Sequence, residues 1–168
     1  MTGSSYSPRF PIRVRTFWPL FVSWVAADFV TKRIAEDSLA LHVPRSVLGE
    51  FFRFTLTYNT GAAMNFSLGQ SSRVAFTVIA AVMLFVIFRM YRETDDRDGW
   101  QAAALALIAA GALGNLLDRL RSARGVVDFI DVGTSGWRFW TFNVADMGVT
   151  VGAALLALLM WRQPRPPE

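Results

Sequence analysis

Four long apolar blocks alternate with polar segments along the chain. They cover about residues 16–35, 72–90, 100–117 and 144–161. A bilayer core of about 30 Å needs roughly 20 mostly apolar residues in helical form, and each block is close to that length. The pattern predicts an integral membrane protein with an all-α bundle of four transmembrane helices, in a single membrane domain covering residues 1–168.

Two longer segments, at about 36–71 and 119–142, separate these blocks. Within the first, residues 52–58 alternate apolar and polar side chains, which is typical of a half-buried strand. The tripeptide Asn-Thr-Gly at 59–61 follows and indicates a turn. We therefore expect a small β-sheet from this segment on the outer membrane surface, and an outer loop at 119–142.

The composition supports a membrane protein and limits the side chains available for catalysis or metal binding. Of 168 residues, 53% are hydrophobic and 18% are charged, below the roughly 25% charge of soluble domains. The sequence has no cysteine and one histidine, His42, so thiolate chemistry and paired-imidazole metal sites are excluded. We expect no metal and no cofactor. The net charge of +4 is assigned to contacts with anionic lipid, and nucleic acid is not an expected partner.

Four spans place both termini on the same side of the membrane. The inner segments are short and dense in arginine, so the positive-inside rule places both termini in the cytoplasm. The first apolar block contains Asp28 and Lys32 and has no small-residue cleavage site. It is therefore interpreted as a retained span and not as a cleaved signal.

Ionisable residues inside spans are costly and indicate function by default. Asp28 and Lys32 are four residues apart, on one helix face in the outer half of the first span. They are either a mutually neutralising pair or a contact for a substrate. Asn115, Asp118 and Arg119 lie at the outer end of the third span. We expect Asp118 to stay ionised beside Arg119 in a structural role.

Two further acids lie in the segment between the third and fourth blocks. Asp128 lies in a segment with strand-like character and has apolar neighbours on both sides. These neighbours would remove water from it and raise its pKa, as suits a proton-handling acid. Asp131 is a weaker candidate. The local sequence alone favours a surface acid at both positions.

The fourth span begins with Asn143-x-x-Asp146. Asn is a favoured N-cap, and an acid three residues later resembles a capping box at the positive end of the helix dipole. Gly148 and Gly152 form a GxxxG pattern that favours close packing on another helix. This pattern places Asp146 against the bundle.

The predicted topology gathers these acids near one depth. The third span leaves the membrane near Asp118, the fourth re-enters near Asp146, and Asp128 lies on the connection between them. Two close carboxylates share one proton. One can then take a proton from water while the other protonates a carbonyl oxygen, which is aspartyl peptide hydrolysis. The alternatives are a proton-coupled transporter and a non-catalytic scaffold in which the acids are helix caps.

Five motifs occur in order along the chain: D-x-x-T-K in the first span, then TYNTGAA, GNLLDR, VVDFI and FNVAD. Together they resemble the lipoprotein signal peptidase (signal peptidase II) family. This resemblance implies a four-helix intramembrane aspartyl endopeptidase of the bacterial inner membrane, with its active site near the outer face. It would cleave prolipoproteins just before the diacylglyceryl-modified cysteine.

The resemblance also implies roles for individual residues. Asp128 and Asp146 would be the catalytic dyad. Residues for substrate positioning or site support would be Asn59, Asn115, Arg119 and Asn143. The polar framework would contain Asp28, Lys32 and Asp118, and the substrate-holding part of the sheet would contain Gly61, Ala62 and Ala63. Asp131 would be an additional acid near the dyad. The expected partners are the lipidated precursor, membrane lipid and globomycin-type inhibitors, with the enzyme a monomer.

Overall fold

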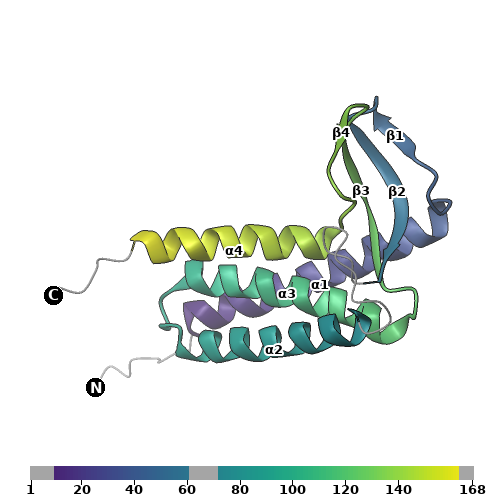
Figure 1. The fold of residues 1–168 in the computed structure, drawn as a ribbon. Coiled ribbons are helices and arrows are strands. Elements are labelled where there is room, and N and C mark those ends of the chain that lie inside the picture. The colour runs from purple at the N-terminus through teal and green to yellow at the C-terminus, as the bar shows by residue number, and fades with distance from the viewer. Residues whose placement is uncertain (1–9, 61–71, 163–168) are drawn as a thin grey trace, which may run out of the picture.

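The computed structural model describes residues 10–60 and 72–162, and four helices form the body of this part of the chain (Figure 1). Their bounds are α1 Ile12–Ser38, α2 Ser72–Glu93, α3 Gly99–Arg121 and α4 Val144–Arg162. Each contains the apolar block predicted from the sequence and extends beyond it by one to four residues, α1 and α3 at both ends and α2 and α4 at the C-terminal end only. Flanking polar residues therefore continue the helices past the apolar blocks.

Helix α3 lies at the centre and packs against α1, α2 and α4 (Figure 1). It is rich in alanine, and a continuous run from Ala104 to Ala110 is buried, so neighbouring helices approach it closely. Helices α2, α3 and α4 are long and apolar enough to cross a membrane. Helix α1 has 27 residues but is more polar than the other three, because it carries several charged side chains.

A four-stranded antiparallel sheet rises from one end of the bundle and extends past the start of α4 (Figure 1). Its strands, in spatial order, are β1 Arg45–Leu48, β2 Phe52–Asn59, β3 Val126–Thr134 and β4 Trp137–Arg138. The strand predicted at 52–58 is confirmed as β2. The segment 119–142, expected as an outer loop with strand-like character around Asp128, contains β3 and β4. Strand β2 needs a neighbouring strand for its backbone hydrogen bonds, and the local sequence does not indicate that β3 supplies it.

The GxxxG face of α4 packs on α3, as the sequence predicted. A Cβ atom at Gly152 would lie 2.7 Å from the carbonyl oxygen of Ala104, and one at Gly148 would lie 3.0 Å from that of Leu107. On the α1 side, the indole N–H of Trp24 donates to the Val144 carbonyl at 3.0 Å. The start of α4 is therefore held between α3 and α1.

Candidate active site

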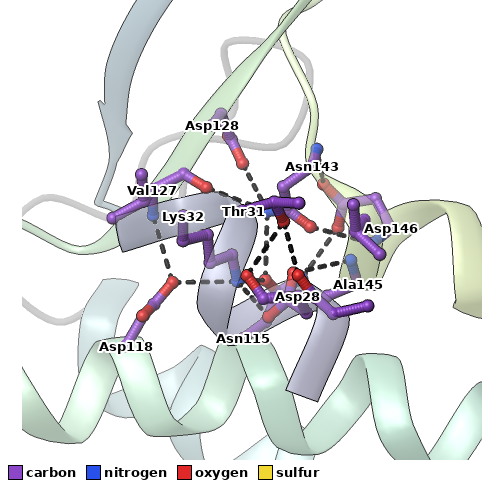
Figure 2. Close-up of polar contacts among 12 residues, drawn as sticks. Asp28, Thr31, Lys32, Asn115, Asp118, Val127, Asp128, Asn143, Ala145 and Asp146 are labelled. Atoms are coloured by element: carbon purple, nitrogen blue, oxygen red, sulfur yellow. Dashed lines mark hydrogen bonds and ion pairs between the residues drawn. The ribbon is translucent and has the colours of Figure 1, made fainter. Parts of the chain in front are cut away.

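Lys32 lies at the centre of a buried polar network near the base of the sheet (Figure 2). Its side chain is only 2% exposed, and its ammonium is 2.8 Å from Asp28 and 2.9 Å from Asp118. It also donates to the side-chain oxygen of Asn115 at 3.0 Å. An ammonium has three N–H donors, and these three contacts use all of them. Of the two roles considered for this pair, the structure supports the neutralising one.

Asn115 on α3 connects Lys32 to α4. Its Oδ1 accepts from Lys32, and it also accepts from the Nδ2 of Asn143 at 3.1 Å. Its own Nδ2 donates to Asp146 Oδ1 at 2.7 Å. The ammonium of Lys32 requires the side-chain oxygen of Asn115 to face it. The amide nitrogen of Asn115 therefore faces the Asp146 carboxylate.

Asn143 joins the two acids that the sequence singled out (Figure 2). Its side chain is fully buried, and its Nδ2 donates to Asp128 Oδ1 at 2.6 Å. Its Oδ1 accepts from the Asp146 backbone N–H at 2.9 Å, while its backbone N–H donates to Asp146 Oδ2 at 3.2 Å. These reciprocal bonds form the predicted capping arrangement at the start of α4. One residue therefore orients both carboxylates.

Asp28 of α1 also caps α4. Its Oδ1 accepts from the Ala145 backbone N–H at 2.8 Å, which satisfies a donor that the helix itself leaves unpaired. The carboxylate fits because residue 114 is glycine, since a Cβ there would overlap Asp28 Oδ2. The sequence motifs contain Asp28 but give no indication of this contact, because the donor is a backbone group 117 residues away.

Asp128 lies on β3 and is 3% exposed. Burial and then the charge of Asp146 raise its pKa to about 7. Hydrogen bonds from Asn143 and from Asn59, at the end of β2, oppose this rise because they favour the ionised form. The expected desolvation of Asp128 is confirmed, because its side chain is buried.

The structure gives Asp118 and Arg119 different partners from those expected. Asp118 pairs with Lys32 and accepts from the Val127 backbone N–H at 3.2 Å, so it supports the start of β3. Arg119 instead donates to the Asn115 carbonyl at 3.2 Å, and its guanidinium lies 5.5 Å from the centre of the Phe76 ring. Neighbouring residues on a helix point in different directions, which explains why the adjacent pair does not interact.

Asp131 belongs to a separate cluster on the sheet. Arg53 and Arg138 donate to its carboxylate at 2.8 and 2.7 Å, and Thr55 donates at 2.8 Å. Burial would raise the pKa of Asp131, but these hydrogen bonds outweigh it and hold the pKa below its usual value. Asp131 is three residues from Asp128 on one strand, so the two side chains lie on opposite faces. It is not part of the Lys32 network.

A groove of about 350 Å³ opens beside Asp146, which is half-buried. Its polar lining comes from Asn115, Arg119, Asp146 and Thr150, and its walls from apolar residues of α2, α3 and α4 and from Trp140. Within residues 10–60 and 72–162, no three His, Cys, Asp or Glu side chains form a group able to hold a metal. Gly61, Ala62 and Ala63 lie outside the described residues.

Residues 20–162 match the family model described as signal peptidase (SPase) II. The chain belongs to the signal peptidase II family. It is 41% identical over 159 residues to a lipoprotein signal peptidase of Pseudomonas syringae pv. tomato, covering 93% of this chain and 91% of that protein. It is 38% identical to one of Geobacter sulfurreducens, covering 90% and 94%. The chain is thus a peptidase and a bacterial membrane protein.

Two solved structures have the same fold. One, a bacterial membrane enzyme determined by the in meso method at 2.3 Å resolution, has a TM-score of 0.80 and 28% identity over 92% of this chain and 96% of that chain. A second, determined by the same method at 1.9 Å, has a TM-score of 0.80 and 29% identity, covering 90% and 96%. The arrangement of helices and sheet is therefore shared with bacterial membrane enzymes of known structure.

Proposed function

We propose that this chain is an intramembrane aspartyl endopeptidase that removes signal peptides from bacterial prolipoproteins. The bond cleaved is the one just before the diacylglyceryl-modified cysteine. Family membership supports the removal of signal peptides from lipoproteins. The observation that carries the aspartyl mechanism is Asn143, which hydrogen bonds to Asp128 and to Asp146 and so brings two carboxylates to one place.

In this mechanism Asp146 is the base and Asp128 is the acid. The Asp146 carboxylate accepts hydrogen bonds from two N–H donors, Asn115 Nδ2 and Asn143 N, which orient its oxygens. Asp128, whose pKa is about 7, holds the shared proton near neutral pH. The dyad therefore has one proton and one negative charge, which is the state that aspartyl hydrolysis needs.

The reaction then proceeds in two proton-balanced steps. Asp146 takes a proton from water as the oxygen attacks the scissile carbonyl carbon, while Asp128 donates its proton to the carbonyl oxygen. In the second step the C–N bond breaks, and Asp146 returns its proton to the leaving amine. Asp128 regains a proton from a hydroxyl of the intermediate as the carboxylic acid product forms. Both carboxyl groups end in their starting states.

The groove beside Asp146 is suited to the substrate. Its apolar walls between α2, α3 and α4 provide a surface for the lipid or the apolar signal peptide, and its polar lining includes Asp146. Arg119 lines the groove and is placed to orient a substrate carbonyl. Asn59 and Asn143 position Asp128, and Asp28, Lys32 and Asp118 support the frame around both acids.

The proposed topology follows from the charges of α1. Its buried pair, Asp28 and Lys32, is neutralised inside the bundle, so α1 is able to serve as a fourth span despite its polar residues. We place the enzyme in the inner membrane as a monomer with both termini in the cytoplasm. The sheet then lies on the outer membrane surface, and the dyad lies close to that face.

The test is in vitro cleavage of a lipidated and a non-lipidated precursor by purified protein. Asp128→Asn and Asp146→Asn should each lower cleavage by at least about 100-fold, because each removes one proton-transfer group. Asp131→Asn is the matched control, since its carboxylate faces the arginine cluster on the sheet. A globomycin-type inhibitor should block the wild-type reaction. Unchanged cleavage by either dyad variant would disprove the assignment.

The two alternatives raised by the sequence are less well supported. Family membership identifies a peptidase, which argues against a non-catalytic scaffold. The buried ionisable residues of the Lys32 network lie together near one end of the helices, beside the base of the sheet (Figures 1 and 2). A proton-coupled transporter needs polar groups that line a path across the membrane.

A further inference from the structure

A second cluster of charged side chains lies at the ends of α1 and α3, outside the Lys32 network. Three arginines converge there on a single carboxylate, Glu36. Arg33 contacts it directly, and Arg121 and Arg124 approach it at 3.5 and 3.7 Å. Three guanidinium groups with one carboxylate leave a net charge of +2 in the cluster. Glu36 is 11% exposed, whereas the arginine side chains are 34%, 41% and 65% exposed.

The surface next to this cluster is apolar. On α1, Phe29 and Val30 are 52% and 50% exposed, and they lie four and three residues before Arg33, on the same helix face. On α3, Leu117 is 44% exposed and lies four residues before Arg121. Each arginine at a helix end therefore has an exposed apolar side chain one turn closer to the middle of the bundle. The arginines match the phosphate headgroup of a phospholipid, and the apolar side chains match its acyl chains.

We propose that Arg33, Arg121 and Arg124 form a binding site for an anionic phospholipid, with the phosphate on the guanidinium groups and the acyl chains along the apolar faces. Charge complementarity selects an anionic headgroup, because the cluster has a surplus of two positive charges around one nearly buried acid. Guanidinium groups bind phosphate oxygens through paired N–H donors. The side chains of Arg121 and Arg124 are exposed and would supply most of these donors, whereas Nε and Nη2 of Arg33 are buried, so Arg33 contributes mainly its charge. The proposal does not depend on the proposed peptidase mechanism.

The cluster is also connected to the sheet. The Tyr58 hydroxyl on β2 donates to Glu36 at 3.1 Å, and the Arg124 guanidinium lies 4.3 Å from the centre of the Tyr58 ring. A headgroup bound by Arg33 and Arg124 would hold α1, α3 and β2 together. A bound lipid should therefore stabilise the folded protein, because a ligand that binds only the native state raises the free energy of unfolding.

The experiment is native mass spectrometry of the full chain in detergent, with phosphatidylglycerol or phosphatidylethanolamine added. The wild type should retain phosphatidylglycerol in preference to phosphatidylethanolamine, and phosphatidylglycerol should raise its melting temperature. Arg121→Gln/Arg124→Gln should bind phosphatidylglycerol about thirtyfold more weakly. Arg89→Gln/Arg92→Gln is the matched control, because it removes the same charge from exposed positions on α2.

Three results would overturn the proposal. The first is equal retention of the two lipids by the wild type. The second is equal loss of phosphatidylglycerol in the cluster variant and in the control. The third is displacement of phosphatidylglycerol by millimolar inorganic phosphate, which would indicate a site for the free ion. Arg121→Lys/Arg124→Lys keeps the charge but loses the paired N–H donors, so it should bind phosphatidylglycerol more tightly than the glutamine variant and more weakly than the wild type.

Discussion

The replacement of Asn143 by alanine tests how one residue serves both acids. The substitution removes the side-chain oxygen that caps α4 and the Nδ2 donor to Asp128. Loss of an N-cap costs about 1 kcal/mol. Loss of the hydrogen bond to a fully buried carboxyl group costs about 1–3 kcal/mol more. We expect Asn143→Ala to lower the free energy of unfolding by about 2–4 kcal/mol, measured by denaturant or thermal unfolding in detergent micelles.

The same substitution should change the pH profile of cleavage. Asn143 donates to the ionised form of Asp128, so removal of this donor raises the Asp128 pKa above its wild-type value of about 7. In the wild type, activity should fall roughly tenfold per pH unit above that pKa, because the acid loses its proton. In Asn143→Ala this decline should move to higher pH, while the maximal rate falls by about 10- to 100-fold through misplacement of both acids.

The control is Asn143→Ser. Serine keeps an N-cap oxygen but has no amide to reach Asp128, so it should recover the capping part of the lost stability. Its pH profile should still resemble that of Asn143→Ala. A decline that stays in place or moves to lower pH in the alanine variant would refute the assignment of Asp128 as the proton-holding acid.

Three further predictions concern the frame around the dyad. Lys32→Met leaves two buried carboxylates without their cation and should cost about 3–5 kcal/mol of stability; a loss below about 1 kcal/mol in chemical unfolding would contradict a structural ion pair. Gly114→Ala should displace Asp28 and cost about 1–3 kcal/mol, whereas Gly136→Ala, with open space around it, should have little effect in the same measurement. Asp128 has a folded pKa of about 7 against 3.8 for the unfolded chain, so the native state binds more protons and wild-type stability should fall by about 4 kcal/mol from pH 4 to pH 8. Asp128→Asn should remove this dependence of stability on pH. If unfolding curves of the variant at several pH values still showed it, the pH dependence would belong to another group.

The helices were predictable because each contains a long apolar block bounded by polar segments. Local sequence was also sufficient for the cap at Asn143 and Asp146, since capping depends on residues three apart. The GxxxG face of α4 was likewise predictable, because small residues in that spacing permit close helix packing. These features depend on residues that are close to one another in the sequence.

The remaining features depend on groups far apart in the chain. Nothing near Asp28 in the sequence indicates that it accepts from the Ala145 backbone, and nothing near Asp118 favours Lys32 over the adjacent Arg119. The sequence around Asp128 indicated strand-like character, but not the pairing of β3, because its hydrogen-bonding partner β2 lies about 70 residues earlier. Asp131 resembled Asp128 in its surroundings along the chain, and only the sheet register, which sets it opposite Arg53, separates the two acids.

The contact between Asp28 and the Ala145 backbone has a consequence for how the protein is made. It joins α1 to α4 across 117 residues of chain. A nascent chain that has been translated only as far as α3 contains Asp28 and Lys32 but neither Asn143 nor Asp146. The candidate site is therefore assembled only once α4 has been made.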